Sequence, residues 1–163
     1  MTGLEPLLER VRFAIFDFDG VFTDNRVWVN EGGEEALAFS RSDGLGLRRL
    51  DEVDVQYLIL SMERNPIVAA RAEKLQAECV QGVDDKLGVV RDRAERTGVA
   101  LADTAYVGND VNDAECLRAV GLPVVPADAW PEVKPLALWV LSRVGGDGCV
   151  REFCDGVWAA QRA

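Results

Sequence analysis

Two aspartates stand two positions apart at the end of an apolar stretch near the start of the chain. Asp17 directly follows the apolar segment 13–16, and Asp19 directly precedes Gly20. Two carboxylates crowded at one place repel each other, and a divalent cation relieves that repulsion. Mg²⁺ prefers oxygen ligands and leaves coordination positions for phosphate oxygens. The pair indicates metal-assisted phosphate chemistry, although such a pair in isolation is also typical of a surface turn.

Three further polar features follow later in the chain. Ser61 comes after the apolar run 58–60, Lys86 opens an expected helix, and Asn109 begins an Asn-Asp-Val-Asn-Asp sequence after Gly108. A hydroxyl and an ammonium group are suited to binding phosphoryl oxygens and neutralising their charge. Each feature alone is equally typical of a loop serine, a solvated lysine or a helix cap. Their joint occurrence in this order favours a single site.

The elements that must position these residues alternate between strand and helix. Strands are expected at 11–16, 55–60, 104–107, 124–125 and 138–141. Helices are expected at 43–50, 66–75, 84–97 and 112–120. This alternation predicts an α/β fold, a Rossmann-like parallel sheet with helices on both faces, whose ligands bind beyond the carboxyl ends of the strands.

A β-hairpin is expected to project after the first strand. The segments 26–30 and 35–40 flank a Gly-Gly turn, as hairpin strands do. Its large apolar residues fall on both faces: Val27, Val29, Leu37 and Phe39 alternate along it, and Trp28 points the other way. A solitary hairpin cannot bury two apolar faces. Either it lies on its own domain, or another chain covers it.

Length and charge narrow the class of protein. The 163 residues predict one domain, 1–163, without an internal boundary. The 18 basic and 28 acidic residues give a net charge of −10, so nucleic acid and anionic membranes are not expected as partners. No apolar run is long enough to span a membrane, and the N-terminus lacks a signal-peptide pattern, which predicts a cytoplasmic protein.

Histidine and cysteine usage restricts the chemistry. The chain has no histidine, which excludes Ser-His, Cys-His and His-metal mechanisms. Its four cysteines lack the paired spacing of zinc sites and are expected to be ordinary thiols. Hydrolysis must therefore depend on carboxylates, lysine, hydroxyls or a metal bound through oxygen.

Together, these motifs resemble those of the haloacid dehalogenase superfamily of phosphohydrolases, which carry Asp-x-Asp, a Ser or Thr, a Lys and a closing acidic motif. More narrowly, the chain resembles the cap-less phosphatases of 3-deoxy-2-keto sugar acids, acting on octulosonate 8-phosphate or sialic-acid-type 9-phosphates. The resemblance covers nearly the whole chain, including segments 39–44, 71–75, 81–87, 105–113 and 145–152. A similar domain follows some sialate cytidylyltransferases.

The resemblance implies a role for each motif. Asp17 would be the nucleophile that forms an aspartyl-phosphate, and Asp19 the acid that protonates the leaving alkoxide. Ser61 and Lys86 would bind the phosphoryl group, and Lys86 would also neutralise charge on Asp17. Mg²⁺ would be bound by Asp17, by Asp19 and by the closing motif, and the backbone carbonyl of Asp19 would be one of its ligands.

Two positions depart from the family pattern. Asn109 stands where relatives usually have a metal-binding Asp, so either Asn109 binds Mg²⁺ directly or Asp110 and Asp113 supply the missing charge, in direct contact or from behind. Ser61-Met62-Glu63 stands where relatives often have Thr-Gly-Arg or Thr-Gly-Glu. Glu63 matches the second form and is expected to bind substrate. Its charge predicts a preference for a nine-carbon acid 9-phosphate over octulosonate 8-phosphate.

The predicted site lacks a cover from its own chain. The stretch between Asp24 and Ser61 is too short for the helical cap found in many relatives, so a neighbouring subunit of a homotetramer is expected to cover an otherwise open site.

Two other functions compete with a Mg²⁺-dependent sugar-acid phosphatase. One is a catalytically weak domain kept for oligomerisation or regulation beside a sialate cytidylyltransferase, and the other is a phosphate-accepting receiver. The receiver is disfavoured because no Asp follows Leu60.

Overall fold

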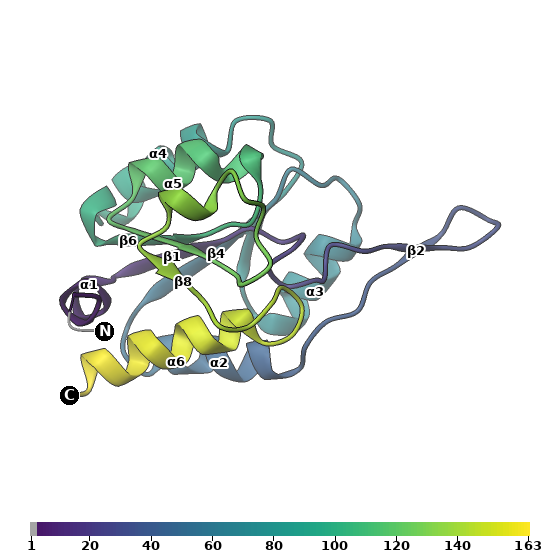
Figure 1. Cartoon of the computed structure of the whole chain (residues 1–163). Coiled ribbons are helices and arrows are strands. Elements are labelled where there is room, and N and C mark those ends of the chain that lie inside the picture. Colours follow the sequence, from purple (N-terminus) through teal and green to yellow (C-terminus); the bar gives the residue numbers. More distant parts are fainter. Residues whose placement is uncertain (1–2) are drawn as a thin grey trace.

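A six-stranded parallel sheet forms the centre of the computed structural model, which describes residues 3–163 (Figure 1). The strands lie in the order β5, β4, β1, β6, β7, β8. Their bounds are β1 (Phe13–Phe16), β4 (Gln56–Leu60), β5 (Glu78–Val80), β6 (Thr104–Val107), β7 (Leu122–Val125) and β8 (Trp139–Val140). The chain adds strands first on one side of β1 and then on the other. The switch point, where ligands bind in such sheets, therefore falls at the carboxyl end of β1.

Helices cover both faces of the sheet, as the alternating sequence pattern predicts. They are α1 (Glu5–Arg10), α2 (Ser42–Asp51), α3 (Ile67–Leu75), α4 (Lys86–Thr97), α5 (Ala114–Ala119) and α6 (Cys149–Gln161). In Figure 1, α4 and α5 lie on one face, and α2 and α6 lie on the other. Each face buries its own apolar cluster. Because β1 and β6 are buried along their whole length, they read as continuous apolar runs rather than alternating ones.

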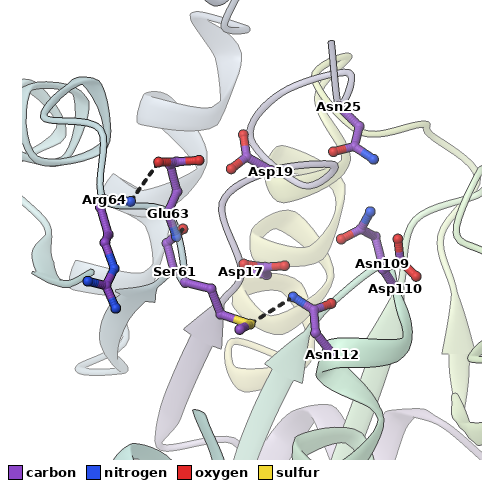
Figure 2. Close-up of a pocket in the computed structure, with 10 residues that line it drawn as sticks. Asp17, Asp19, Asn25, Ser61, Glu63, Arg64, Asn109, Asp110 and Asn112 are labelled. Atoms are coloured by element: carbon purple, nitrogen blue, oxygen red, sulfur yellow. Dashed lines mark hydrogen bonds between the residues drawn. The ribbon is translucent and has the colours of Figure 1, made fainter. Parts of the chain in front are cut away.

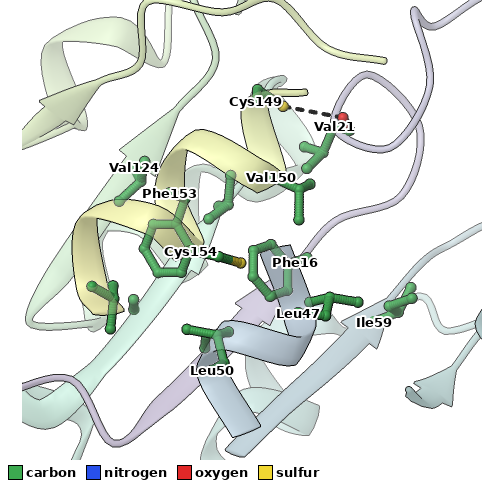
Figure 3. Close-up of a cluster of buried hydrophobic side chains, with 14 of the residues drawn as sticks. Phe16, Val21, Leu47, Leu50, Ile59, Val124, Cys149, Val150, Phe153 and Cys154 are labelled. Carbon is green, nitrogen blue, oxygen red and sulfur yellow. Dashed lines mark hydrogen bonds between the residues drawn. The ribbon is translucent and has the colours of Figure 1, made fainter. Parts of the chain in front are cut away.

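The cluster under α2 and α6 is the larger apolar layer (Figure 3). The rings of Phe16 and Phe153 meet edge to face with centroids 5.4 Å apart. A methyl group at Gly46 would lie 2.9 Å from the Cα of Arg151, so the missing side chain allows the two helices to approach closely. This packing supports β1, the strand that directly precedes Asp17.

Most expected elements are confirmed, with shifted ends. The first strand begins at Phe13 rather than at 11, and α4 begins at Lys86 because the side chain of Asp85 caps it, accepting a hydrogen bond from the Gly88 N–H at 2.8 Å. The expected helix 112–120 divides into a 3₁₀ turn, Val111–Asp113, and α5. No helix within residues 3–163 has the length and apolar character needed to cross a membrane.

Within residues 3–163, two α-helices and one strand were not anticipated from sequence: α1, α6 and β5. The strand β5 has three residues and begins with Glu78, so it offers little apolar pattern. The helix α6 does have a recognisable apolar pattern, because its buried residues recur at helical spacing: Val150, Phe153, Cys154 and Val157. That spacing was a sufficient signal for the helix.

The hairpin projects from the body of the molecule, as expected (Figure 1). Its strands, β2 (Trp28–Val29) and β3 (Glu35–Ala36), are antiparallel and shorter than predicted. Of the two alternatives for covering its apolar residues, contact with its own domain holds for Leu37 and Phe39, which pack against the core of their own chain. The Phe39 ring lies 5.6 Å from that of Phe18. Val27, Trp28 and Val29 remain exposed, Trp28 to 75%.

Candidate active site

The polar residues that follow β1, β4 and β6 surround one open cavity of about 400 Å³ (Figure 2). Asp17 and Asp19 come from the loop after β1, Ser61 from the end of β4, and Asn109 from the loop after β6. These strands are neighbours, and parallel strands bring their carboxyl ends to the same edge. The lining residues are Asp17, Asp19, Asn25, Ser61, Met62, Glu63, Arg64, Asn109, Asp110 and Asn112.

Asp17 lies at the floor of this cavity with only 5% of its surface exposed. Its Oδ1 lies 2.7 Å from Lys86 Nζ and accepts a hydrogen bond from the Phe18 N–H at 2.7 Å. Both contacts use the same oxygen, which leaves Oδ2 for a phosphoryl group or a cation. Burial, and next the nearby Asp113 carboxylate, raise the pKa of Asp17 to about 8, although Lys86 acts in the opposite direction.

Lys86 reaches Asp17 from behind the cavity rather than lining it. Its ammonium group is buried between two carboxylates, with Asp17 Oδ1 at 2.7 Å and Asp113 Oδ1 at 2.8 Å. Desolvation lowers the pKa of Lys86, but the two carboxylates outweigh it and raise the pKa overall. Lys86 therefore carries its charge between these two side chains.

Asp113 is fully buried and does not line the cavity. Its Oδ1 accepts hydrogen bonds from Lys86 and from the Tyr106 hydroxyl at 2.7 Å. Its Oδ2 accepts the N–H groups of Asn109, at 2.8 Å, and Asp110, at 3.3 Å. Four protein donors thus occupy both oxygens. Of the two roles expected for Asp113, direct contact with the metal and a supporting place behind it, this position favours the second, because no lone pair is left to face the cavity.

Asn109 has a buried side-chain oxygen whose surroundings suit a cation. Within residues 3–163, no group hydrogen-bonds to its buried Oδ1. A buried amide oxygen without a partner is costly, and a cation would satisfy it. Gly20 makes room for this side chain, since a Cβ there would overlap the Asn109 amide. Asn109 and the carboxylates of Asp17 and Asp19 form the all-oxygen donor set that Mg²⁺ prefers, so the residues present fit that ion.

Asp19 and Glu63 place two carboxylates at the mouth of the site. Burial and the nearby Glu63 raise the pKa of Asp19, which favours its protonated form. Glu63 is held by its own loop, because its Oε1 accepts the N–H groups of Arg64, at 2.6 Å, and Asn65, at 2.8 Å. Both carboxylates also line an adjoining hollow of about 240 Å³, at the root of the hairpin.

The predicted site residues come together with few exceptions. Asp17, Asp19, Ser61, Glu63, Asn109 and Asp110 line the cavity, and Lys86 touches Asp17 from below. Sequence reasoning missed the lining residues Asn25, Met62, Arg64 and Asn112, and Tyr106 beneath the site. Met62, Arg64 and Asn112 sit beside recognised motif residues, which was the available signal. Nothing in the sequence marked Asn25, because its place depends on how the loop after β1 turns back.

Comparison with known proteins identifies this arrangement. The sequence profile of the haloacid dehalogenase-like hydrolases matches residues 51–153. The chain belongs to this family. Its Rossmann-like sheet with the site at the end of β1 is therefore the haloacid dehalogenase fold, as expected.

Relatives of known activity narrow the family to phosphatases. The 3-deoxy-D-manno-octulosonate 8-phosphate phosphatase KdsC of Escherichia coli K12 is 36% identical over 154 residues, covering 94% of this chain and 82% of that protein. The Yersinia pestis enzyme of the same name, solved by crystallography, is 34% identical with a TM-score of 0.94, covering 98% and 86%. This haloacid dehalogenase-like hydrolase is a phosphatase, a phosphoric monoester hydrolase.

A third relative shows ligands in a similar fold. The Moraxella catarrhalis 3-deoxy-D-manno-octulosonate 8-phosphate phosphatase, solved with a magnesium ion, a phosphate ion and a KDO molecule, is 28% identical. Its TM-score is 0.95, over 99% of this chain and 94% of that one. The haloacid dehalogenase-like hydrolase described here shares that backbone almost throughout.

Proposed function

We propose that residues 1–163 form a single Mg²⁺-dependent phosphatase domain that hydrolyses the phosphate ester of a 2-keto-3-deoxy sugar acid through an aspartyl-phosphate. The observation that carries the proposal is the contact between Asp17 and Lys86 at the floor of the cavity. A carboxylate held against a buried ammonium group, with one oxygen left over, is suited to attack phosphorus. The relatives named above support the class of substrate.

Asp17 and Asp19 divide the chemistry between them. An oxygen of Asp17 attacks phosphorus and forms an acyl-phosphate bond, while the bond between phosphorus and the sugar oxygen breaks. Asp19, whose pKa is raised by burial and by Glu63, donates its proton to the departing alkoxide. Water then attacks the phosphorus of the aspartyl-phosphate, Asp19 takes up the proton, and inorganic phosphate leaves with Asp17 restored.

Ser61 and Lys86 stabilise the charge on the transferring group. Ser61 Oγ already accepts the Glu63 N–H at 3.0 Å, which leaves its own proton for a phosphoryl oxygen. Lys86 offsets the negative charge that gathers between Asp17 and the phosphoryl group. Asp17, Asp19 and Asn109 would hold Mg²⁺, with Asp110 beside them. When bound, the ion would supply charge neutralisation and a template for the phosphate.

Glu63 is the residue on which we base substrate choice. Together with Asp19, Glu35 and Arg26 it lines the hollow next to the cavity, where acidic groups outnumber the single guanidinium, so a substrate carboxylate near the phosphate would meet mainly like charge there. In an eight-carbon acid the carboxylate lies nearer the phosphate than in a nine-carbon acid. We therefore expect the nine-carbon 9-phosphate to be preferred, although the named relatives act on the octulosonate ester.

A neighbouring subunit is our proposal for closing the open site. The exposed Val27, Trp28 and Val29 lie on a hairpin that extends away from the body of the chain (Figure 1). An apolar projection of this kind is a typical protein contact surface. Assembly into a homotetramer would bury it and provide the enclosure that substrate binding requires.

The deciding experiment measures phosphate release from both sugar-acid phosphates, with and without Mg²⁺. We expect Mg²⁺-dependent turnover of both, a higher kcat/KM for the nine-carbon ester, and a smaller difference in Glu63→Gln. A tenfold preference for the octulosonate ester would refute the substrate choice alone. A folded chain that turns over neither ester would instead favour the oligomerisation or regulatory role beside a cytidylyltransferase.

A further inference from the structure

Tyr106 is a buried polar residue for which the reaction outlined above has no role. It lies on β6 in the apolar layer formed with Ile15, Leu58 and Leu60, and it is completely inaccessible to solvent. Its hydroxyl donates a hydrogen bond of 2.7 Å to Asp113 Oδ1. A hydroxyl placed in such a layer is costly without a hydrogen-bond partner, and the partner at 2.7 Å lies on the side of the active site.

The oxygen that Tyr106 contacts is also the one that holds Lys86. Lys86 Nζ lies 2.8 Å from Asp113 Oδ1 and 2.7 Å from Asp17 Oδ1. One continuous series of polar contacts therefore runs from β6 to the cavity. Its members are Tyr106, Asp113, Lys86 and Asp17. Each distance is that of a strong, charge-assisted contact.

The four donors around Asp113 contact different oxygens of its carboxylate and differ in rigidity. The N–H groups of Asn109 and Asp110 fix Oδ2, and both belong to the loop that carries the metal-binding amide. On Oδ1, Lys86 is a flexible side chain, whereas the Tyr106 hydroxyl sits on a rigid ring in the central sheet. The tyrosine is thus the rigid contact that sets the angle of the carboxylate toward Lys86.

We propose that Tyr106 is a positioning residue, which acts through Asp113 to fix Lys86 Nζ against Asp17. The inference rests on the proposed roles of Asp17 and Lys86. Small displacements of a charged group from its working geometry have large effects on transition-state stabilisation and little on ground-state binding. Loss of the Tyr106 hydroxyl should consequently lower kcat and leave KM nearly unchanged.

The test compares Tyr106→Phe with Tyr57→Phe. Tyr57 is the matched control, because its hydroxyl contacts Arg48 at 2.7 Å, away from the cavity. With para-nitrophenyl phosphate and saturating Mg²⁺, we expect kcat to fall about tenfold in Tyr106→Phe, as for loss of one hydrogen bond to a charged group, with KM within twofold. Tyr57→Phe should keep the wild-type kcat. A Tyr106→Phe enzyme with unchanged kcat, or with a raised KM alone, would overturn the proposal.

A double-mutant cycle separates positioning from general destabilisation. If Tyr106 acts through Asp113, its substitution in an Asp113→Asn background should have less than a third of its effect on kcat in the wild type. An equal fold-change in both backgrounds contradicts the proposed series. Turnover that persists in Asp17→Asn would instead refute the proposed function, which keeps the two failures distinct.

A fluorine label covers the case in which Tyr106→Phe does not fold. The chain has two tyrosines, so 3-fluorotyrosine incorporated into Tyr57→Phe reports on Tyr106 alone. Its fluorine resonance should shift when Mg²⁺ and orthovanadate, a phosphoryl mimic, are added together. A resonance that does not move would show that Tyr106 is a structural residue only.

Discussion

Lys86 Nζ lies 2.7 Å from Asp17 Oδ1, and the two side chains are 2% and 7% exposed. Ion pairs at protein surfaces contribute little, but removing one partner of a buried pair leaves an uncompensated charge. The pair therefore couples the stability of the chain to its chemistry. The same contact that keeps Lys86 charged places its charge where a phosphoryl group would accumulate negative charge.

Replacing the nucleophile tests the mechanism most directly. Asp17→Asn should remove essentially all turnover, because an amide does not form the acyl-phosphate. Asp19→Asn should retain a trace, with kcat lowered at least about 100-fold by the loss of acid catalysis. Steady-state phosphate release measures both, and Asp92→Asn, on the exposed side of α4, is the control. Near-normal turnover in Asp17→Asn would refute the assignment.

The affinity for Mg²⁺ should depend on Asn109, which stands where relatives usually have an Asp. EDTA should inactivate the enzyme reversibly, and Asn109→Asp should lower the Mg²⁺ concentration for half-maximal activity by about tenfold, equivalent to roughly 1.4 kcal/mol. The added carboxylate should also lower the melting temperature without Mg²⁺, since like charges would crowd Asp17 and Asp19. Titrations of activity and of melting temperature with Mg²⁺ check both. Hydrolysis that is indifferent to EDTA would contradict the metal site.

Assembly is expected to depend on the hairpin. Light scattering should give a mass near that of four chains, and Trp28→Lys should lower it by placing charge on the 75% exposed ring position. Glu31→Gln, at the turn of the same hairpin, should leave the mass unchanged. A wild-type monomer with full activity would show that the site needs no cover from another subunit.

Asp43 should make the stability of the chain fall as pH rises. This buried carboxylate accepts the Arg151 N–H at 3.1 Å, and its pKa is raised by burial to about 6, from an ordinary value near 3.8. The protonated form is therefore favoured by folding. Its contribution is complete below about pH 4 and is lost as pH rises through 6, by up to about 3 kcal/mol.

The comparison with Asp43→Asn isolates this contribution. Urea titrations between pH 4.5 and 8 measure the free energy of unfolding of both proteins. The free energy of the variant should rise relative to that of the wild type as pH rises, and the difference should be constant above pH 7. Other titrating groups act on both proteins alike and cancel. Two parallel curves would show that Asp43 ionises normally in the folded chain.

Both the type of fold and the main members of the site could be predicted from sequence. Apolar runs ending in Asp17, Ser61 and Asn109 indicate parallel strands whose polar ends meet, because local pattern and chain direction suffice for that inference. The helical spacing of α6 was present as well, although it was not recognised. These features depend on residues near one another in the chain.

What only the tertiary structure decided is the direction in which each polar side chain faces. Asp110 and Asp113 belong to one short acidic motif, yet Asp110 lines the cavity while Asp113 turns inward to Lys86 and Tyr106. Leu37 and Phe39 likewise turn to their own core while Trp28 does not. The sequence determined which groups gather at the sheet edge. The inward turn of Asp113 depends in addition on donors on β6 and α4, which meet it only once the chain has folded.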